Sequence, residues 1–324
     1  MPALRFIFMI LASLSALVLP AAAQKYPDHV VRIVNPFPPG GSVEITARIL
    51  ALKLAENTGG QFIVENRTGA GGNIGSDSVA KSDPDGYTLL FTAPGPLSVN
   101  QTLYAKGLPF NPEKDLTPIA IFARTPIVLM VNPKLPVKDV KELIAYAKAN
   151  PGQVNFGSAG MGSTPHLSGE LLKSLAKVNL THVPYRGTGP AMADLVAGHI
   201  QMMFDLLPAS LQQIRSGNVR ALANAGATRP SALKDLPTIA EQGIPGFDAS
   251  SWVALMAPAK TPAPVLAQLR AEVAKAMASD DVKKRLDDLG SETGTADEKE
   301  ARAFLASETK KWAAVIKASG ARVE

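Results

Sequence analysis

Four turns of this chain combine glycine, proline, serine and threonine in a pattern that suits the binding of an anion. They occupy residues 36–42, 92–96, 157–165 and 184–190. Each follows a short β-branched or aromatic run and precedes a helical pattern, so each is expected at the carboxyl end of a strand, where ligands bind in open α/β sheets. Glycines expose backbone N–H groups, hydroxyls add donors, and the following helix contributes its free N-terminal N–H groups. The turns therefore predict a carboxylate site.

Such a site can be strong without a buried arginine. A hydrogen bond to a charged group contributes roughly 1.5–3 kcal/mol, and a helix N-terminus adds about 0.3–1 kcal/mol. Three or four donors then suffice, after ordering costs, for micromolar binding at about −8 kcal/mol. The third turn is the best of the four, because Thr164 before Pro165 predicts an N-cap followed by proline at the first helical position.

One acidic residue occupies a comparable position. Asp205 follows the apolar run 202–204 and precedes the helical pattern that begins near Ser210. It is predicted either to cap that helix or to accept a hydrogen bond from an amine, hydroxyl or bound water of the ligand. The sequence leaves both roles open.

The chain lacks the common motifs of catalysis and metal binding. It has no cysteine, which excludes disulfides, a thiol nucleophile and cysteine-ligated metal centres. Ser158 is not in a nucleophile elbow, because Phe156 stands where that motif needs glycine. Residues 69–75 resemble a dinucleotide fingerprint, but Ile74 replaces its third glycine, so we interpret them as a helix-entry turn. No metal-ligand spacing relates the four histidines, which are His29, His166, His182 and His199. We predict no cofactor, no metal and no catalysis.

Composition and the first residues indicate an exported globular protein. The 324 residues are 46% hydrophobic and 19% charged, and 33 Lys+Arg against 28 Asp+Glu leave a net charge of +5. The basic residues are scattered, so nucleic acid is not an expected partner. Residues 1–23 are predicted to be a signal peptide cleaved after Ala23, with Arg5 before an apolar run that Pro20 ends too early for a membrane anchor. The mature protein is expected in the periplasm.

The rest of the chain alternates strand and helix patterns. This alternation predicts an α/β fold with two mostly parallel sheets. From Pro262 onward the pattern predicts helices only, with Trp312 and Ile316 on one apolar face. The predicted strands are 30–34, 62–64, 87–91, 127–131, 154–156, 180–183, 200–204, 219–222 and 252–256.

No low-complexity linker separates two independent domains. We therefore expect the chain to pass between two lobes more than once, at the proline-containing stretches 117–126 and 242–251. The first lobe is predicted to comprise residues 24–122 and 249–324, and the second residues 123–248.

An ordered set of motifs makes the chain resemble a known family from Tyr26 almost to its end. It is similar to the Bug family, the extracytoplasmic solute receptors associated with tripartite tricarboxylate transporters. The motifs are PFPPGG at 36–41, VENR at 64–67 leading into GAGGNIG at 69–75, PDGYTLL at 84–90, NFGSAG at 155–160, STPHL at 163–167, VPYRG at 183–187 and MFD at 203–205.

The resemblance implies a fold like that of type II periplasmic binding proteins, two α/β lobes with a ligand cleft between them. It also implies a small organic acid as ligand, held by backbone N–H groups and hydroxyls of both lobes with water bridging to the first loop. The implied partners are the permease subunits of a tripartite tricarboxylate-type transporter, and a monomer is expected. The turns and the resemblance together give these candidate ligand-binding residues: Pro38, Gly40, Gly41, Ser42, Ala93, Gly95, Ser158, Ala159, Ser163, Thr164, His166, Tyr185 and Asp205.

The chain departs from the family pattern at two places. Residues 42–44 read Ser-Val-Glu where the family commonly has Gly-Thr-Asp or Gly-Ser-Asp, and Arg186 replaces the usual lysine. Two alternatives stay open at this stage. One is a ligand-sensing receptor for a membrane signalling partner, and the other is an exported α/β hydrolase that would depend on Ser158 or His166.

Overall fold

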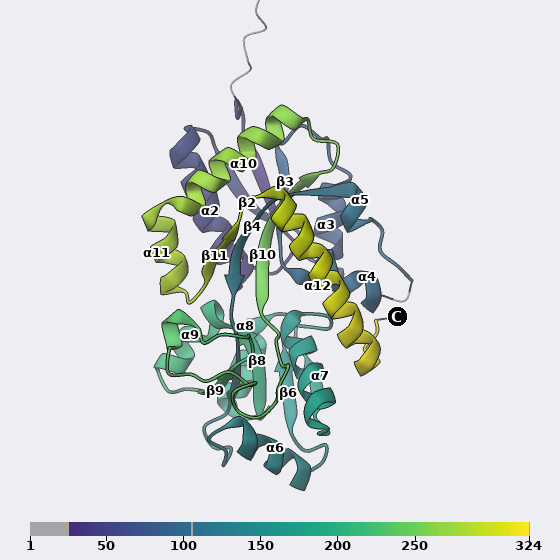
Figure 1. Ribbon diagram of the computed structural model, residues 1–324, viewed down its shortest axis with the longest axis vertical. Coiled ribbons are helices and arrows are strands. Elements are labelled where there is room, and N and C mark those ends of the chain that lie inside the picture. The colour runs from purple at the N-terminus through teal and green to yellow at the C-terminus, as the bar shows by residue number, and fades with distance from the viewer. Residues whose placement is uncertain (1–25, 105, 324) are drawn as a thin grey trace, which may run out of the picture.

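The computed structural model describes residues 26–104 and 106–323, so the predicted signal peptide at 1–23 lies outside the described residues. Two β-sheets form the framework, one above the other in Figure 1. The strands are β1 (Val31–Asn35), β2 (Phe62–Asn66), β3 (Thr88–Thr92), β4 (Leu116–Thr125), β5 (Ile127–Val131), β6 (Asn155–Ser158), β7 (Thr181–Pro184), β8 (Met202–Leu206), β9 (Arg220–Asn224), β10 (Ser251–Pro258) and β11 (Glu292–Thr295).

Both sheets mix parallel and antiparallel strands. The first has the order β11-β4-β10-β3-β1-β2 and the second β7-β6-β8-β5-β9. β1 is parallel to β2 and β3, and β6 is parallel to β7 and β8, whereas the pairings made by β4, β5, β10 and β11 are antiparallel. The prediction of mostly parallel sheets is therefore wrong. A short apolar run shows that a strand is buried but not the direction of its neighbour.

Helices cover both faces of each sheet. The helices are α2 (Ser42–Thr58), α3 (Asn73–Ala80), α4 (Asn100–Leu103), α5 (Pro112–Asp115), α6 (Val140–Ala149), α7 (Thr164–Ala176), α8 (Thr188–Ala197), α9 (Leu207–Arg215), α10 (Ala263–Ala278), α11 (Asp280–Asp288) and α12 (Glu298–Ser319), with short helical turns η1 (Ala70–Gly72), η2 (Gly95–Val99) and η3 (Ser231–Leu233). Alternation along a strand assigns neighbours to opposite faces. Ile33 packs with α2, α10 and α11, and Val34 packs with α3 and α12.

The chain crosses between the sheets where β4 gives way to β5 and again before β10. Pro126 separates β4 of the first sheet from β5 of the second. On the return, Ala249 N–H donates to the carbonyl of Ala225 at 2.8 Å, and β10 then enters the first sheet at Ser251. The turns at the strand ends of both sheets consequently face the zone between them.

The last part of the chain differs from its prediction in two ways. Residues 292–295 form the edge strand β11, which the expectation of helices only missed because Glu-Thr-Gly-Thr has no apolar alternation. α12 starts over the first sheet and runs down toward α7 (Figure 1), where Trp312 and Ile316 join the core around Phe156 of the second sheet. Among the described residues, no helix combines the length and apolar character that crossing a bilayer requires.

Candidate functional site

A cavity of about 1250 Å³ lies between the two sheets. All four of the glycine- and proline-containing turns contribute to its wall. Ten of the predicted site residues line it, namely Pro38, Gly40, Gly41, Ser42, Ala93, Gly95, Ala159, Ser163, Thr164 and Tyr185. Parallel neighbours explain this convergence, because β1, β2 and β3 end on the same edge of one sheet and β6, β7 and β8 on the same edge of the other.

The N-terminus of α2 forms the first-lobe part of the wall. Gly41 is the N-cap and has no side chain to satisfy the first N–H groups of the helix. Ser42 is 6% exposed as a residue, and its Oγ has no hydrogen-bond partner among the described residues. A buried hydroxyl without a partner carries a free-energy cost. Because this oxygen is almost fully covered, a polar ligand in the cavity would satisfy it once the Ser42 side chain turns toward the ligand.

Glu44 changes one expectation for this loop. Its Oε2 accepts the N–H of Gly40 at 2.6 Å, and its Oε1 accepts from Arg48 Nη2 at 2.6 Å. The hydrogen bond from Gly40, helped by Arg48, holds the pKa of the Glu44 carboxyl below its ordinary value. The backbone N–H of Gly40 therefore already donates a hydrogen bond to Glu44 and is not available to a ligand. Gly40 lines the cavity with its other atoms. The Glu44 carboxylate points to its own loop, not to the cavity.

The segment after β6 forms the facing wall. Ser163, not Thr164, is the N-cap of α7, since its Oγ accepts from His166 N–H at 3.4 Å. The same Oγ donates to the carbonyl of Gly160 at 2.7 Å. Thr164 is the first helical residue and lines the cavity. The predicted N-cap, Thr164, is one position too late, because Ser163 and Thr164 both carry a hydroxyl that can cap a helix.

The loop between β7 and α8 carries the cavity's charge. Arg186 is the one charged side chain among the described lining residues, and it has no hydrogen bond or ion pair within the described part of the chain. Gly187 caps α8 without a side-chain contact, so the N–H groups of this helix terminus are also open. Beside them, Tyr185 donates from its hydroxyl to Asp194 Oδ2 at 2.6 Å, and burial together with this bond raises the pKa of Tyr185 to about 12.

Three predicted residues do not line the cavity. Ser158 and His166 are 0% and 2% exposed and lie behind its wall. Asp205 is fully buried and accepts hydroxyl hydrogen bonds from Thr188 Oγ1 at 3.0 Å and Ser210 Oγ at 2.8 Å. Its burial raises its pKa to about 6 despite these bonds. The three side chains therefore lie outside the cavity lining. Ser158 and Asp205 lie at strand ends, where alternate side chains face the core, and His166 lies on a buried side of α7.

Sequence reasoning also missed part of the wall. The loop 68–72 lines the cavity, although we interpreted the glycines of 69–75 only as a helix-entry turn. Its signal was the same as that of the other four turns, a glycine-rich segment directly after a strand. Ser251, Tyr104 and Val323 line the cavity too, brought there by the return crossing and the packing of the chain's end. Ser251 is 1% exposed, and its Oγ, like that of Ser42, has no partner among the described residues.

The electrostatics of the cavity suit a negative ligand. No aspartate or glutamate of residues 26–104 and 106–323 is among its lining residues, and the N-termini of α2, α7 and α8 all open onto it. Partial positive charge at each helix N-terminus and the Arg186 guanidinium act in the same direction. Within residues 26–104 and 106–323, no group of acidic or histidine side chains could hold a metal ion.

Comparisons with known proteins agree with this geometry. A family model described as "Tripartite tricarboxylate transporter family receptor" matches residues 46–321. Protein BugT of Bordetella pertussis is 38% identical over 319 residues, which cover 98% of this chain and 97% of BugT.

Three solved structures are similar over whole chains. R. palustris Rpa4515 with adipate has a TM-score of 0.88 and 37% identity, covering 92% of this chain and 100% of its own. Periplasmic binding protein BugD has a TM-score of 0.85 and 34% identity, covering 92% and 100%. MatC from Rhodopseudomonas palustris with bound malate has a TM-score of 0.84 and 34% identity, covering 90% and 100%.

Proposed function

The chain belongs to the tripartite tricarboxylate transporter receptor family, and on that premise we propose that its cavity captures a small organic carboxylate. It is a solute-binding receptor and not an enzyme. The observation that carries the proposal is the cavity's lining. Helices of both lobes open their N-termini onto it, Arg186 supplies a positive charge, and none of the described lining residues is acidic. The adipate and malate of two similar structures support the same class of ligand.

The carboxylate meets donors from both lobes. On the first lobe these are the N–H groups at the start of α2 and the unpartnered Oγ of Ser42. On the second lobe they are the N-terminus of α8 and Arg186. Charge-assisted hydrogen bonds of roughly 1.5–3 kcal/mol each make a three- or four-donor site sufficient for micromolar affinity. Because the donors come from both sides, the ligand favours the arrangement that brings the lobes together.

We place this capture in the periplasm, with cleavage after Ala23 and a monomeric mature protein. The ligand-loaded form is then what the permease subunits of a tripartite transporter receive. The relative named as a periplasmic binding protein and the apolar run before Pro20 support this location. No covalent step is involved, since the Ser158 hydroxyl and the His166 ring lie behind the wall.

The test is a thermal-shift screen of residues 24–324. Adipate and malate are compared with adipamide and malamide, which keep the shape and remove the charge. A ligand that binds the folded state raises the melting temperature as its concentration increases. A free ligand concentration of 100 times Kd adds about 2.7 kcal/mol to the free energy of unfolding. We expect carboxylates to shift the transition and the amides not to. A panel in which neutral amides shift it and no carboxylate does contradicts the proposal.

A charge variant makes the test specific to the cavity. Arg186→Gln removes the lining charge and should weaken binding and reduce its dependence on salt. Lys260→Gln is the matched control, because Lys260 is exposed beyond Pro258, the end of β10 opposite to Ser251 and the cavity. Equal affinity and salt dependence in Arg186→Gln and the parent protein would remove Arg186 from the site.

A further inference from the structure

Two of the four histidines meet behind the second-lobe wall of the cavity. His166 on α7 is 2% exposed, and its ring stacks on that of His182 of β7 with centroids 4.1 Å apart. The ring of Phe156 lies on His182 as well, at 4.8 Å. Neither imidazole lines the cavity, and the binding mechanism described above uses neither.

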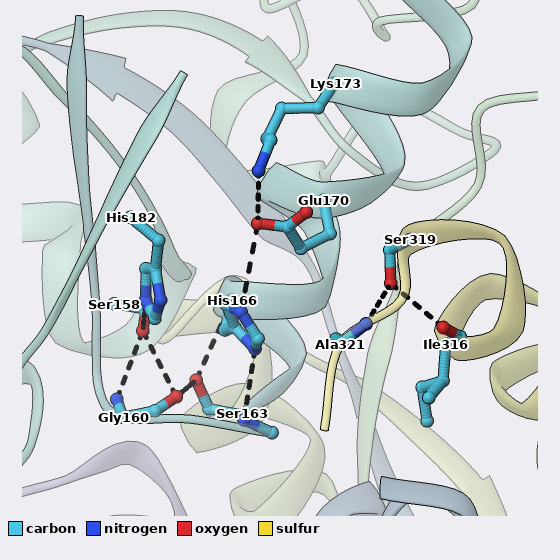
Figure 2. Close-up of polar contacts among 11 residues, drawn as sticks. Ser158, Gly160, Ser163, His166, Glu170, Lys173, His182, Ile316, Ser319 and Ala321 are labelled. Atoms are coloured by element: carbon cyan, nitrogen blue, oxygen red, sulfur yellow. Dashed lines mark hydrogen bonds and ion pairs between the residues drawn. The ribbon is translucent and has the colours of Figure 1, made fainter. Parts of the chain in front are cut away.

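Both imidazoles form hydrogen bonds at the side of one segment that faces away from the cavity. We call this segment, residues 159–163, the β6–α7 loop. His182 Nε2 and Ser158 Oγ share a hydrogen bond of 2.8 Å at the start of the loop. Gly162 N–H donates to His166 Nδ1 at 3.1 Å near its end. Ser158 Oγ also accepts from Gly160 N–H at 3.2 Å, so the contact from His182 reaches the middle of the loop (Figure 2).

The bond from Gly162 defines the protonation of His166. A ring nitrogen that accepts from a backbone N–H carries no proton, so the neutral His166 ring has its proton on Nε2. That nitrogen faces Glu170 Oε1 at 4.0 Å, and Glu170 is paired with Lys173 at 2.9 Å. A second proton on Nδ1 would set two N–H groups against each other. Burial, with His182 and Lys173 nearby, lowers the pKa of His166 to about 3, in keeping with a neutral ring.

The loop needs such support because of its shape and its position. Gly160 and Gly162 have φ values of +134° and +75°, conformations that glycine adopts without strain. The loop lines the cavity on one side, and a Cβ at Gly162 would collide with Leu103 of α4 in the first lobe. A small displacement of Gly162 would therefore move both the ligand wall and a contact between the lobes.

We propose that His166 and His182 are positioning residues, whose neutral imidazoles anchor the β6–α7 loop from behind in the shape that binds the ligand. This inference rests on the proposed function for the cavity. It assigns Ser158 the same indirect role, as the link between His182 and Gly160. Packing alone would be served equally well by apolar rings, whereas the hydrogen bonds to Gly162 and Ser158 require ring nitrogens at defined atoms.

Paired substitutions separate the hydrogen bond from the packing. Asn in place of His166 carries an oxygen on Cγ, where His carries Nδ1, whereas Leu fills similar space without an acceptor. We expect His166→Leu to weaken adipate binding by at least about tenfold and His166→Asn by less than about threefold. Gln places a polar atom where His182 has Nε2, so His182→Gln and His182→Leu form the second pair. His29→Asn, at a histidine whose side chain is 63% exposed and which precedes β1, at the edge of the first sheet away from the cavity, is the control and should leave affinity unchanged.

A second measurement needs no ligand and keeps the two proposals distinguishable. The Gly162 amide should exchange with solvent at least about tenfold faster in His166→Leu than in the parent, and within about threefold of the parent in His166→Asn. Nitrogen NMR of the parent at neutral pH should show His166 protonated at Nε2 alone. If adipate fails to bind but these results hold, the ligand assignment is wrong and the positioning role stands. Native affinity and native Gly162 protection in His166→Leu, or a proton on Nδ1, would overturn the inference.

Discussion

The buried carboxyl of Asp205 makes folding stability depend on pH in a direction unusual for an aspartate. The side chain is fully buried, and burial raises its pKa from 3.8 to about 6, although Thr188 and Ser210 donate hydrogen bonds to it. Between about pH 4 and about pH 6 the folded chain holds a proton here that the unfolded chain has released. Stability is therefore lost as the pH rises through this range.

The size of the effect follows from the shift. A difference of roughly two pKa units at about 1.36 kcal/mol per unit amounts to about 3 kcal/mol. Asp205→Asn removes the titrating group and keeps an oxygen that accepts from one of the two hydroxyls. The free energy of unfolding of the parent minus that of the variant should then fall by about 3 kcal/mol in all between about pH 3 and about pH 7, with about 2 kcal/mol of the fall between pH 4 and pH 6, and stay level above pH 7.

Urea unfolding followed by circular dichroism at a series of pH values measures this difference. All other titrating groups are common to the two proteins, so their contributions cancel. A difference that stays constant within about 0.5 kcal/mol, or that rises with pH, would refute the reasoning. A constant difference would mean that the two hydroxyl hydrogen bonds balance the cost of burying the charge, so that Asp205 ionises at its ordinary pKa. A rising difference would mean that they outweigh this cost and lower the pKa of Asp205.

Two other sites give predictions for equilibrium unfolding. Glu308→Ala should lower stability by about 3–5 kcal/mol, because Oε2 of Glu308 accepts from the indole N–H groups of both Trp252 and Trp312, at 2.8 and 3.0 Å. Glu308→Gln keeps an acceptor and should cost less than half as much. A loss below about 1 kcal/mol in the alanine variant would contradict this prediction. Gly169→Ala in α7 should destabilise the protein by about 1–3 kcal/mol, since the added Cβ would collide with the ring of Phe156 in β6. The added Cβ of Gly189→Ala in α8 meets nothing within 4 Å, so this variant should be neutral or stabilising. Equal effects of the two substitutions would show that the core of the second lobe adjusts to the added methyl group.

Local features of the site were readable from residue order. The glycine- and proline-containing turns follow strands and precede helices, and this order alone predicts unpaired backbone N–H groups at the carboxyl ends of strands. It located ten residues that line the cavity, Gly41 and Ser42 among them, because turn and cap chemistry depends on neighbours within a few positions. The absence of cysteine likewise excluded thiol chemistry from composition alone.

Only the tertiary structure decided which polar groups face the cavity and which face the core. Ser158 and Asp205 stand at strand ends like the lining residues, yet His182 holds one, and Thr188 and Ser210 the other. Glu44 reaches back to an amide that the turn pattern leaves open. Likewise, the end of α12 joins the core of the other sheet through Trp312. Periodicity records that a side chain is buried, but its partner comes from a distant segment, and distance in space is set only when the sheets pack.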